Sequence, residues 1–470
     1  MSRNLFPALP FALTFALGAA LAGFALAAFS PGLLNDGDTY WHIRAGEWML
    51  AHRAVLRSDI FSYTMAGAPW HTQEWLAEIL MALGWIAGGW QGIHLLFAVF
   101  TGLTAGLVGF FVRKRLDMMP ALLTVVLGLC CVSGSLLARP HMLTLPLLAL
   151  WVCGLVAARE QNRAPPFWLI VVMPLWANLH GSFAFGLALA GALGFEAVAE
   201  AQDRKKVALA WGLFLLAAAV SSMATPFGYQ TLLFPFHLSG MQSLANIGEW
   251  QASDLSHLSP LALALLTSLF VLGSGRVKVA PIRLLLFLGL IWLALGHVRH
   301  QMLLGVAAPI LLAPSLAKTW PARSDSHPPL FGALAAAGLV ALIAVRLLVP
   351  VVRGDDAMSP VSALAHVPPS LRETRVLNDY AFGGYLIWTG IKVFIDSRAD
   401  FYGDSFLQNY AGMLSPDRDA LAASLNRYQA HWTIFSRTTP MAKLMDTMPG
   451  WRRLYSDKLA TVHVREDMHH

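Results

Sequence analysis

Two aspartates, Asp36 and Asp38, follow the first apolar segment of the chain in the stretch LLNDGDTYWHIRAG. A histidine and an arginine, His42 and Arg44, come directly after them. Asp38 and His42 are four residues apart, so a helix that begins here would place both side chains on one face. Gly37 tolerates backbone conformations that would turn both carboxylates toward one point.

This pair of acids has three interpretations. Two neighbouring carboxylates suit a divalent cation, Mg²⁺ or Mn²⁺, to which Glu249 would add a third ligand. One carboxylate would instead serve as a general base that takes the proton of an acceptor hydroxyl. The plain alternative is that Asp38 caps a helix beginning near Tyr40, since Asp is a preferred N-cap residue. Glu74 and Glu78 repeat the four-residue spacing, and they suit either a functional site or the wet face of a helix.

Arginines and histidines recur beside the ends of other apolar segments, in RPH (139–141), NLHGSF (178–183) and HVRH (297–300). On separate outer loops, such cations would together suit the phosphate or pyrophosphate of a lipid-linked molecule. Polar residues that face lipid headgroups would give the same pattern. The candidate phosphate-binding residues are His42, Arg44, Arg139, His141, His180, Arg299 and His300.

Long apolar segments position these residues. The chain has 470 residues, of which 56% are hydrophobic and 13% charged, and its mean hydropathy is +0.56. Soluble domains carry about 25% charged residues. The pattern predicts a polytopic helical membrane protein with about eleven spans. The first is LPFALTFALGAALAGFALAAF, an uncleaved anchor, and the others lie near 93–112, 119–137, 141–157, 166–178, 182–198, 206–223, 260–274, 283–297, 301–317 and 330–350.

The basic residues predict the orientation. With a cytoplasmic N-terminus, five basic loops fall on the inside, and the long loop 225–259 on the outside has no Lys or Arg. The net charge of +6 therefore reflects membrane orientation rather than nucleic-acid binding. The segment 73–89 is too short to span and is interpreted as a helix in the outer interface. We expect a bacterial inner-membrane protein whose C-terminal domain is periplasmic.

The spans carry almost no ionisable group near the middle of the membrane, Arg346 near an outer end being the main exception. An ion-coupled transporter would be expected to have such groups. The three cysteines lie in apolar segments and imply no disulfide framework. The sequence also has no Walker loop, dinucleotide-binding fingerprint, zinc spacing or Gly-x-Ser-x-Gly elbow.

The composition changes after residue 350, and the last 120 or so residues resemble a small soluble domain. TRVLNDY, IKVFIDSRAD, AHWTIFSR and KLATVHV read as strands, and FGGYLIW and PDRDALAASLNRYQ read as helices. Strand and helix alternate, which favours an α/β domain. Asp396 and Arg398 suggest an ion pair, with ligand contact as the alternative. We therefore predict a transmembrane domain (1–350), with an external loop (31–92) that carries interfacial helices, and an external domain (351–470).

This plan resembles the C-type integral-membrane glycosyltransferases, such as protein O-mannosyltransferases and the oligosaccharyltransferase catalytic subunit. Members carry an acidic motif just after the first span, where this chain has NDGDTYWHIRAG, and interfacial helices follow it. The oligosaccharyltransferase subunit also has an external-loop glutamate, which Glu249 resembles in NIGEWQ. Its Trp-Trp-Asp-Tyr-Gly motif is similar to LNDYAFGGYLIW, which keeps Asp379 and Tyr380 but lacks both tryptophans and the glycine.

The resemblance implies an inverting transfer of a sugar from a polyprenyl-phosphate donor to a glycan, lipid or protein acceptor outside the membrane. It implies that Asp36 and Asp38 are catalytic, and that Glu249, Asp379 and Tyr380 contact the acceptor. Two alternatives remain open. One is a polymerase- or ligase-like glycan enzyme that works through Arg and His, and the other is a non-catalytic scaffold that binds lipid-linked intermediates.

Overall fold

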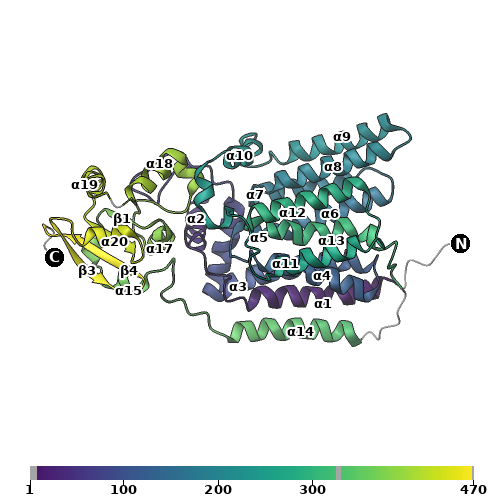
Figure 1. Ribbon diagram of the computed structural model, residues 1–470, viewed down its shortest axis with the longest axis horizontal. Coiled ribbons are helices and arrows are strands. Elements are labelled where there is room, and N and C mark those ends of the chain that lie inside the picture. The colour runs from purple at the N-terminus through teal and green to yellow at the C-terminus, as the bar shows by residue number, and fades with distance from the viewer. Residues whose placement is uncertain (1–7, 324–329, 416, 468–470) are drawn as a thin grey trace. The chain divides into compact units, whose positions relative to one another are not determined.

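The computed structural model describes residues 8–323, 330–415 and 417–467. They form a mostly helical structure with one small sheet near the C-terminus (Figure 1). The chain divides into two compact units, which are described separately. The first contains residues up to 33 with 91–236 and 245–350, and the second contains 34–90, 237–244 and 351–470.

The first unit is built from apolar helices that follow the predicted segments. α1 and α14 lie side by side, as do α8 and α9 (Figure 1). Short 3-10 turns connect some of the helices: η1 (Phe167–Val171), η2 (Ser243–Asn246), η3 (Gly248–Trp250) and η4 (Val298–His300). The helices are α1 (Ala8–Ala28), α3 (Trp75–Arg113, beyond its kink), α4 (Met118–Ser133), α5 (Pro140–Leu143), α6 (Leu145–Glu160), α7 (Val172–Leu179), α8 (Phe183–Glu200), α9 (Arg204–Ser221), α10 (Gln230–Ser239, in its first part), α11 (Pro260–Gly273), α12 (Pro281–Gly296), α13 (Gln301–Leu316) and α14 (Leu330–Leu348).

The expected number of about eleven spans is not what the structure shows. All eleven predicted segments contain helix. Within the described residues, however, only α1, α3 and α8 are long and apolar enough to cross a membrane. Helices such as α4, α11 and α12 have 14 to 16 residues. At about 1.5 Å per residue they fall short of a hydrocarbon core of about 30 Å.

The basic loops meet at one end of this unit, as the charge pattern predicts. Arg115 pairs with Glu160, and the buried Glu196 accepts from both Arg159 and Arg283. The backbone of Ala322 donates to the carbonyl of Arg115. The five basic loops lie at the opposite helix ends from the loops that carry Arg139, Glu249 and Arg299.

The second unit joins the loop after α1 to the C-terminal region. Its helices α2 (Asp38–His52) and the start of α3 pack closely, because the Cα of Gly46 lies against the carbonyl of Glu78. α3 has a kink at Gly88 and Gly89, and the φ of Gly89 is 56°. The segment 73–89, which was predicted to be a helix of its own, therefore forms the part of α3 before this kink. A shared core explains why this loop belongs with 351–470 rather than with the transmembrane domain as predicted. The core includes Trp41, Met49, Leu56, Phe61, Trp70, Leu364, Val376, Phe382, Leu386, Trp432 and Val462.

The sheet has the strand order β1-β2-β4-β3, with β1 parallel to β2 and the other neighbours antiparallel. Three predicted strands and both predicted helices are present, but IKVFIDSRAD is not a strand of the sheet. Val393 instead makes an isolated bridge with Ser62. The elements are β1 (Val376–Asn378), β2 (Trp432–Ser436), β3 (Trp451–Ser456), β4 (Ala460–Arg465), α15 (Val361–Ala365), α16 (Pro369–Arg372), α17 (Gly383–Trp388), α18 (Ala399–Met413), α19 (Arg418–Arg427) and α20 (Pro440–Met445), with the turn η5 (Tyr380–Phe382).

Candidate functional site

Six of the predicted site residues come together at one end of the first unit. We call this group the arginine–glutamate cluster: Arg139, His141, His180, Glu249, Arg299 and His300. Glu249 lies at its centre, with one carboxylate oxygen 2.5 Å from Nη1 of Arg139 and the other 3.0 Å from Nη1 of Arg299. Three separate loops therefore supply the charged groups. The elements that position them are α5, the end of α12 and the short turns η3 (Gly248–Trp250) and η4 (Val298–His300).

Aromatic rings surround these charges. The guanidinium of Arg299 lies 4.4 Å from the ring centroid of Trp250, a cation–π contact. The rings of His141 and His180 meet edge to face with centroids 5.8 Å apart. His300 packs against Trp250 and against His297, whose Nδ1 lies 2.7 Å from the carbonyl oxygen of Trp250. These contacts hold both arginines beside the histidines.

Burial keeps His180 and His300 neutral. It lowers the pKa of His180 well below its usual value, and Arg299 and His141 lower it further. The pKa of His300 falls to about 4, because of burial first and Arg299 second. Burial alone would raise the pKa of Glu249, but Arg139 and Arg299 outweigh it and lower the pKa overall. At neutral pH the cluster thus holds two arginine cations against the one anion of Glu249, a balance that favours an anionic ligand.

The predicted catalytic aspartates belong to the second unit. Asp36 and Asp38 are only 4% and 7% exposed. The backbone N–H of Asp38, the first residue of α2, donates to Oδ1 of Asp36 at 3.0 Å, so Asp36 bonds to the start of this helix. Gly384 at the start of α17 lies against the carbonyl of Gly37, and a side chain there would collide with it. The loop around Gly37 is therefore held between α2 and α17.

His42 and Arg44 lie on α2 near the aspartates, and both contact carboxylates. Nδ1 of His42 lies 3.2 Å from Glu78 and its Nε2 3.7 Å from Glu74. Arg44 pairs with Glu47 at 2.7 Å and donates to the carbonyl of Trp388. The structure thus gives these two predicted phosphate-binding residues partners within their own unit.

Asp379 and Tyr380, the predicted acceptor-binding pair, lie where β1 ends. The carboxylate of Asp379 accepts from the backbone N–H groups of Ala381 and Ser436, each at 3.1 Å. Burial raises its pKa, and these two donors oppose the rise. The hydroxyl of Tyr380 donates to the carbonyl of Ser397 at 3.2 Å. Both side chains hold the turn between β1 and α17.

The predicted metal ligands are Asp36, Asp38 and Glu249. Among the described residues, no three His, Cys, Asp or Glu side chains are grouped so as to hold a metal ion. Both oxygens of Glu249 accept from arginines, and Glu249 belongs to a different unit from the aspartates. The metal therefore stays a prediction.

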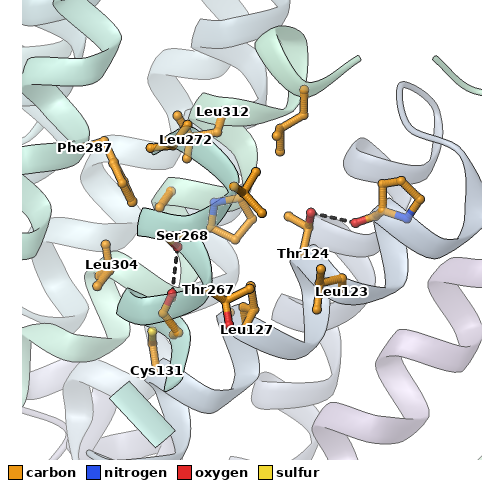
Figure 2. A pocket seen from close by; sticks show the side chains of 18 of the residues that line it. Leu123, Thr124, Leu127, Cys131, Thr267, Ser268, Leu272, Phe287, Leu304 and Leu312 are labelled. Atoms are coloured by element: carbon orange, nitrogen blue, oxygen red, sulfur yellow. Dashed lines mark hydrogen bonds between the residues drawn. The ribbon is translucent and has the colours of Figure 1, made fainter. Parts of the chain in front are cut away.

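An apolar groove of about 420 Å³ lies in the first unit between α4, α11, α12 and α13. Figure 2 shows Leu123, Leu127, Leu272, Leu304 and Phe287 around it, with the hydroxyls of Thr124 and Ser268 bonded to backbone carbonyls. It extends along α13 from Leu304 to Leu316. At about 1.5 Å per residue this is roughly 18 Å, and its near end lies one helical turn from His300.

Sequence reasoning missed three features of these sites. It gave no role in the site to Trp250, although its position next to Glu249 was the available signal. It gave no role to Asp59, which pairs with the buried Arg398 at 2.7 Å; the predicted ion pair between Arg398 and Asp396 is confirmed. No feature of the sequence indicated the groove, because its leucines resemble those of any apolar helix.

No protein-family model matches the chain, and neither does any curated protein. Among solved structures, the chain is similar to the oligosaccharyltransferase of Archaeoglobus fulgidus in its apo form. The two are 11% identical with a TM-score of 0.49, and the alignment covers 94% of this chain and 71% of the archaeal one. A likeness of this size carries no argument about activity.

Proposed function

We propose that this protein is a membrane glycosyltransferase that takes a sugar from a polyprenyl-phosphate donor. The observation that carries the proposal is the arginine–glutamate cluster at the end of an apolar groove. Two arginines are well suited to bind phosphate through paired N–H donors. The groove offers a path for the lipid chain that leaves from that phosphate.

In this proposal the protein needs no cofactor to make or break bonds. Asp36 or Asp38 accepts the proton of the acceptor hydroxyl, whose oxygen forms a bond to the anomeric carbon. The bond from that carbon to the phosphate oxygen breaks at the same time, and the lipid phosphate leaves with the negative charge. Arg139 and Arg299 stabilise this charge, and the sugar inverts its configuration. The acceptor is a glycan, lipid or protein on the outer side of the membrane.

A polymerase- or ligase-like glycan enzyme is the second candidate. A specific observation favours it: the arginine–glutamate cluster contains neither aspartate, and Asp36 bonds locally to the start of α2. Such an enzyme would use the arginines and histidines and would keep its activity without the two acids.

The test uses purified full-length protein and a mixed pool of polyprenyl-phosphate sugars. Arg299→Gln is expected to weaken donor binding about 10-fold or more, since a charge-assisted hydrogen bond contributes about 1.5–3 kcal/mol. Asp36→Asn and Asp38→Asn are assayed for sugar release, with the exposed Asp419→Asn as the matched control. Loss of release with binding retained in either variant supports the glycosyltransferase. Full release in both supports the second candidate, and unchanged donor binding in Arg299→Gln contradicts both.

A further inference from the structure

Arg346 is a buried cation on an otherwise apolar helix. It is the sole charged residue of α14 (LFGALAAAGLVALIAVRLL) and lies in the last turn of that helix. The side chains on both sides of it in the sequence are exposed, with Val345 at 44% and Leu347 at 50%, whereas Arg346 itself is 4% exposed. A long cationic side chain at a span end ordinarily extends to water. This one is covered by the protein instead.

The guanidinium of Arg346 lacks a partner in the part of the chain that the structure describes. Among the described residues none forms a hydrogen bond or ion pair with it, and its Nε and Nη2 atoms are buried without an acceptor. Three other buried arginines have carboxylate partners: Arg159 and Arg283 share Glu196, and Arg398 pairs with Asp396. The helix dipole favours a cation at a helix C-terminus, but this gain is smaller than the cost of burying an unpaired ion.

The position of Arg346 indicates where an anion would come from. α14 runs parallel to α1, since Gly332 lies near Thr14 and Gly338 near Leu21. The chain after α1 reaches Leu33, whose carbonyl accepts from Ala138. Arg346 therefore lies at the end of the first unit that also carries the arginine–glutamate cluster, where an apolar helix would meet lipid headgroups. Figure 1 shows α1 and α14 side by side.

The end of α14 is also held firmly enough to form a site. Nε2 of Gln91, at the start of the straight part of α3, donates to the carbonyls of Leu347 and Val349 at 3.0 and 3.1 Å. These bonds satisfy carbonyls that a helix C-terminus leaves open. The last turn, and with it the backbone of Arg346, is thereby fixed on α3.

We propose that Arg346 binds the phosphodiester of an anionic membrane phospholipid. The guanidinium fork matches two phosphate oxygens, and the exposed apolar side chains of Val345, Leu347, Leu348 and Val349 would contact the acyl chains. The apolar surroundings favour a lipid phosphate over a free one. This inference does not depend on the proposed function.

The test is native mass spectrometry and thermal unfolding of the full chain in detergent, titrated with phosphatidylglycerol, phosphatidylcholine or inorganic phosphate. We expect wild type to bind phosphatidylglycerol and to unfold at a higher temperature with it. Arg346→Gln is expected to weaken this binding about 10-fold or more. Arg346→Lys keeps the charge but not the fork and should bind at an intermediate level. Arg276→Gln, which removes an exposed arginine from a loop, is the matched control.

The outcomes separate clearly. Selective loss of phosphatidylglycerol binding in the Arg346 variants, with the control unchanged, supports the site. Equal binding in wild type and Arg346→Gln overturns it, and so does an equal response of wild type to inorganic phosphate or phosphatidylcholine. If Arg346→Gln fails to fold, the comparison of wild type with Arg346→Lys decides: equal affinity for phosphatidylglycerol in both overturns the bidentate contact.

Discussion

Individual side chains of the arginine–glutamate cluster carry charges that depend on their neighbours. Glu249 stays ionised because Arg139 and Arg299 outweigh the effect of its burial. His300 stays neutral because burial and Arg299 disfavour its charged form. Any other group in the cluster that became positively charged by taking up a proton would therefore be repelled by the two arginines. The pKa values of Glu249 and His300 thus set the pH range in which the cluster keeps these charges.

His300 gives a prediction for pH dependence. Its pKa is about 4 in the folded protein, below the ordinary value of about 6.5. Between these values the unfolded chain binds a proton that the folded chain does not, so stability falls as the pH drops through this window. His300→Gln should remove about 1–2 kcal/mol of the loss between pH 7 and 5.

Thermal unfolding in detergent at pH 7, 6 and 5 measures this effect. His257→Gln is the control, because the side chain of His257 is 68% exposed. The prediction fails if His300→Gln loses as much stability between pH 7 and 5 as wild type does.

At the scale of elements, α4 and α13 approach each other through two glycines. A Cβ atom on Gly305 would lie 2.5 Å from the carbonyl oxygen of Gly128 and 3.0 Å from the Cβ of Cys131. The reverse contact from Gly128 is equally tight. Both glycines line the groove, so this contact also sets the groove's depth.

Gly305→Ala should therefore destabilise the protein by about 1–3 kcal/mol, the usual effect of overpacking. This exceeds the gain of about 1 kcal/mol that Ala brings to a helix interior. Gly289→Ala on α12 is the control, because a side chain there meets open space. Detergent unfolding temperatures compare the two, and a Gly305→Ala protein at least as stable as Gly289→Ala would contradict the close approach.

At the scale of the whole molecule, the second unit is assembled from stretches far apart in the sequence. Arg398 joins two of them, because it bonds to Asp59 at 2.7 Å and to Asp396 at 2.6 Å. Its guanidinium also lies 4.5 Å from the ring of Trp70. The third stretch is held by Asp404, which accepts from the backbone of residues 242 and 243.

Arg398→Met is expected to lower the free energy of unfolding by about 3–5 kcal/mol, because it leaves two buried carboxylates without their cation. Limited proteolysis of the full chain should then cut within 53–74, where Asp59 lies. Lys458→Met, at an exposed position, should leave both readouts unchanged. Wild-type stability and proteolysis in Arg398→Met would show that the ion pair does not hold the loop.

The helical segments of the first unit followed from the sequence, because apolar runs and basic loops are local properties of the chain. The same signal overcounted the spans. Runs such as 260–274 and 283–297 are apolar enough to be counted as spans but cover only 15 residues each, which is short for a hydrocarbon core of about 30 Å. Gly273 and Gly296 end α11 and α12 after 14 and 16 residues.

The candidate site was partly predictable for a related reason. Arg139, His180 and Arg299 stand at the ends of predicted segments. Because successive segments run in opposite directions, every second connecting loop lies on the same side. The sequence therefore indicated a shared end of the molecule. It did not indicate that Glu249 would lie between the two arginines, because loops 110 and 50 residues apart meet only after the helices have packed.

The sequence by itself determined the apolar helices and the change of composition after residue 350. It also determined that the basic loops lie at one end of the helices and the loops with Arg139, Glu249 and Arg299 at the other. These depend on residue type and on periodicity within a few turns. Only the tertiary structure decided that residues 34–90 share a core with 351–470, that Arg398 pairs with Asp59 and that, among the described residues, Arg346 has no carboxylate partner. Such pairings depend on which distant segments pack together, and burial then determines which charges must find a partner.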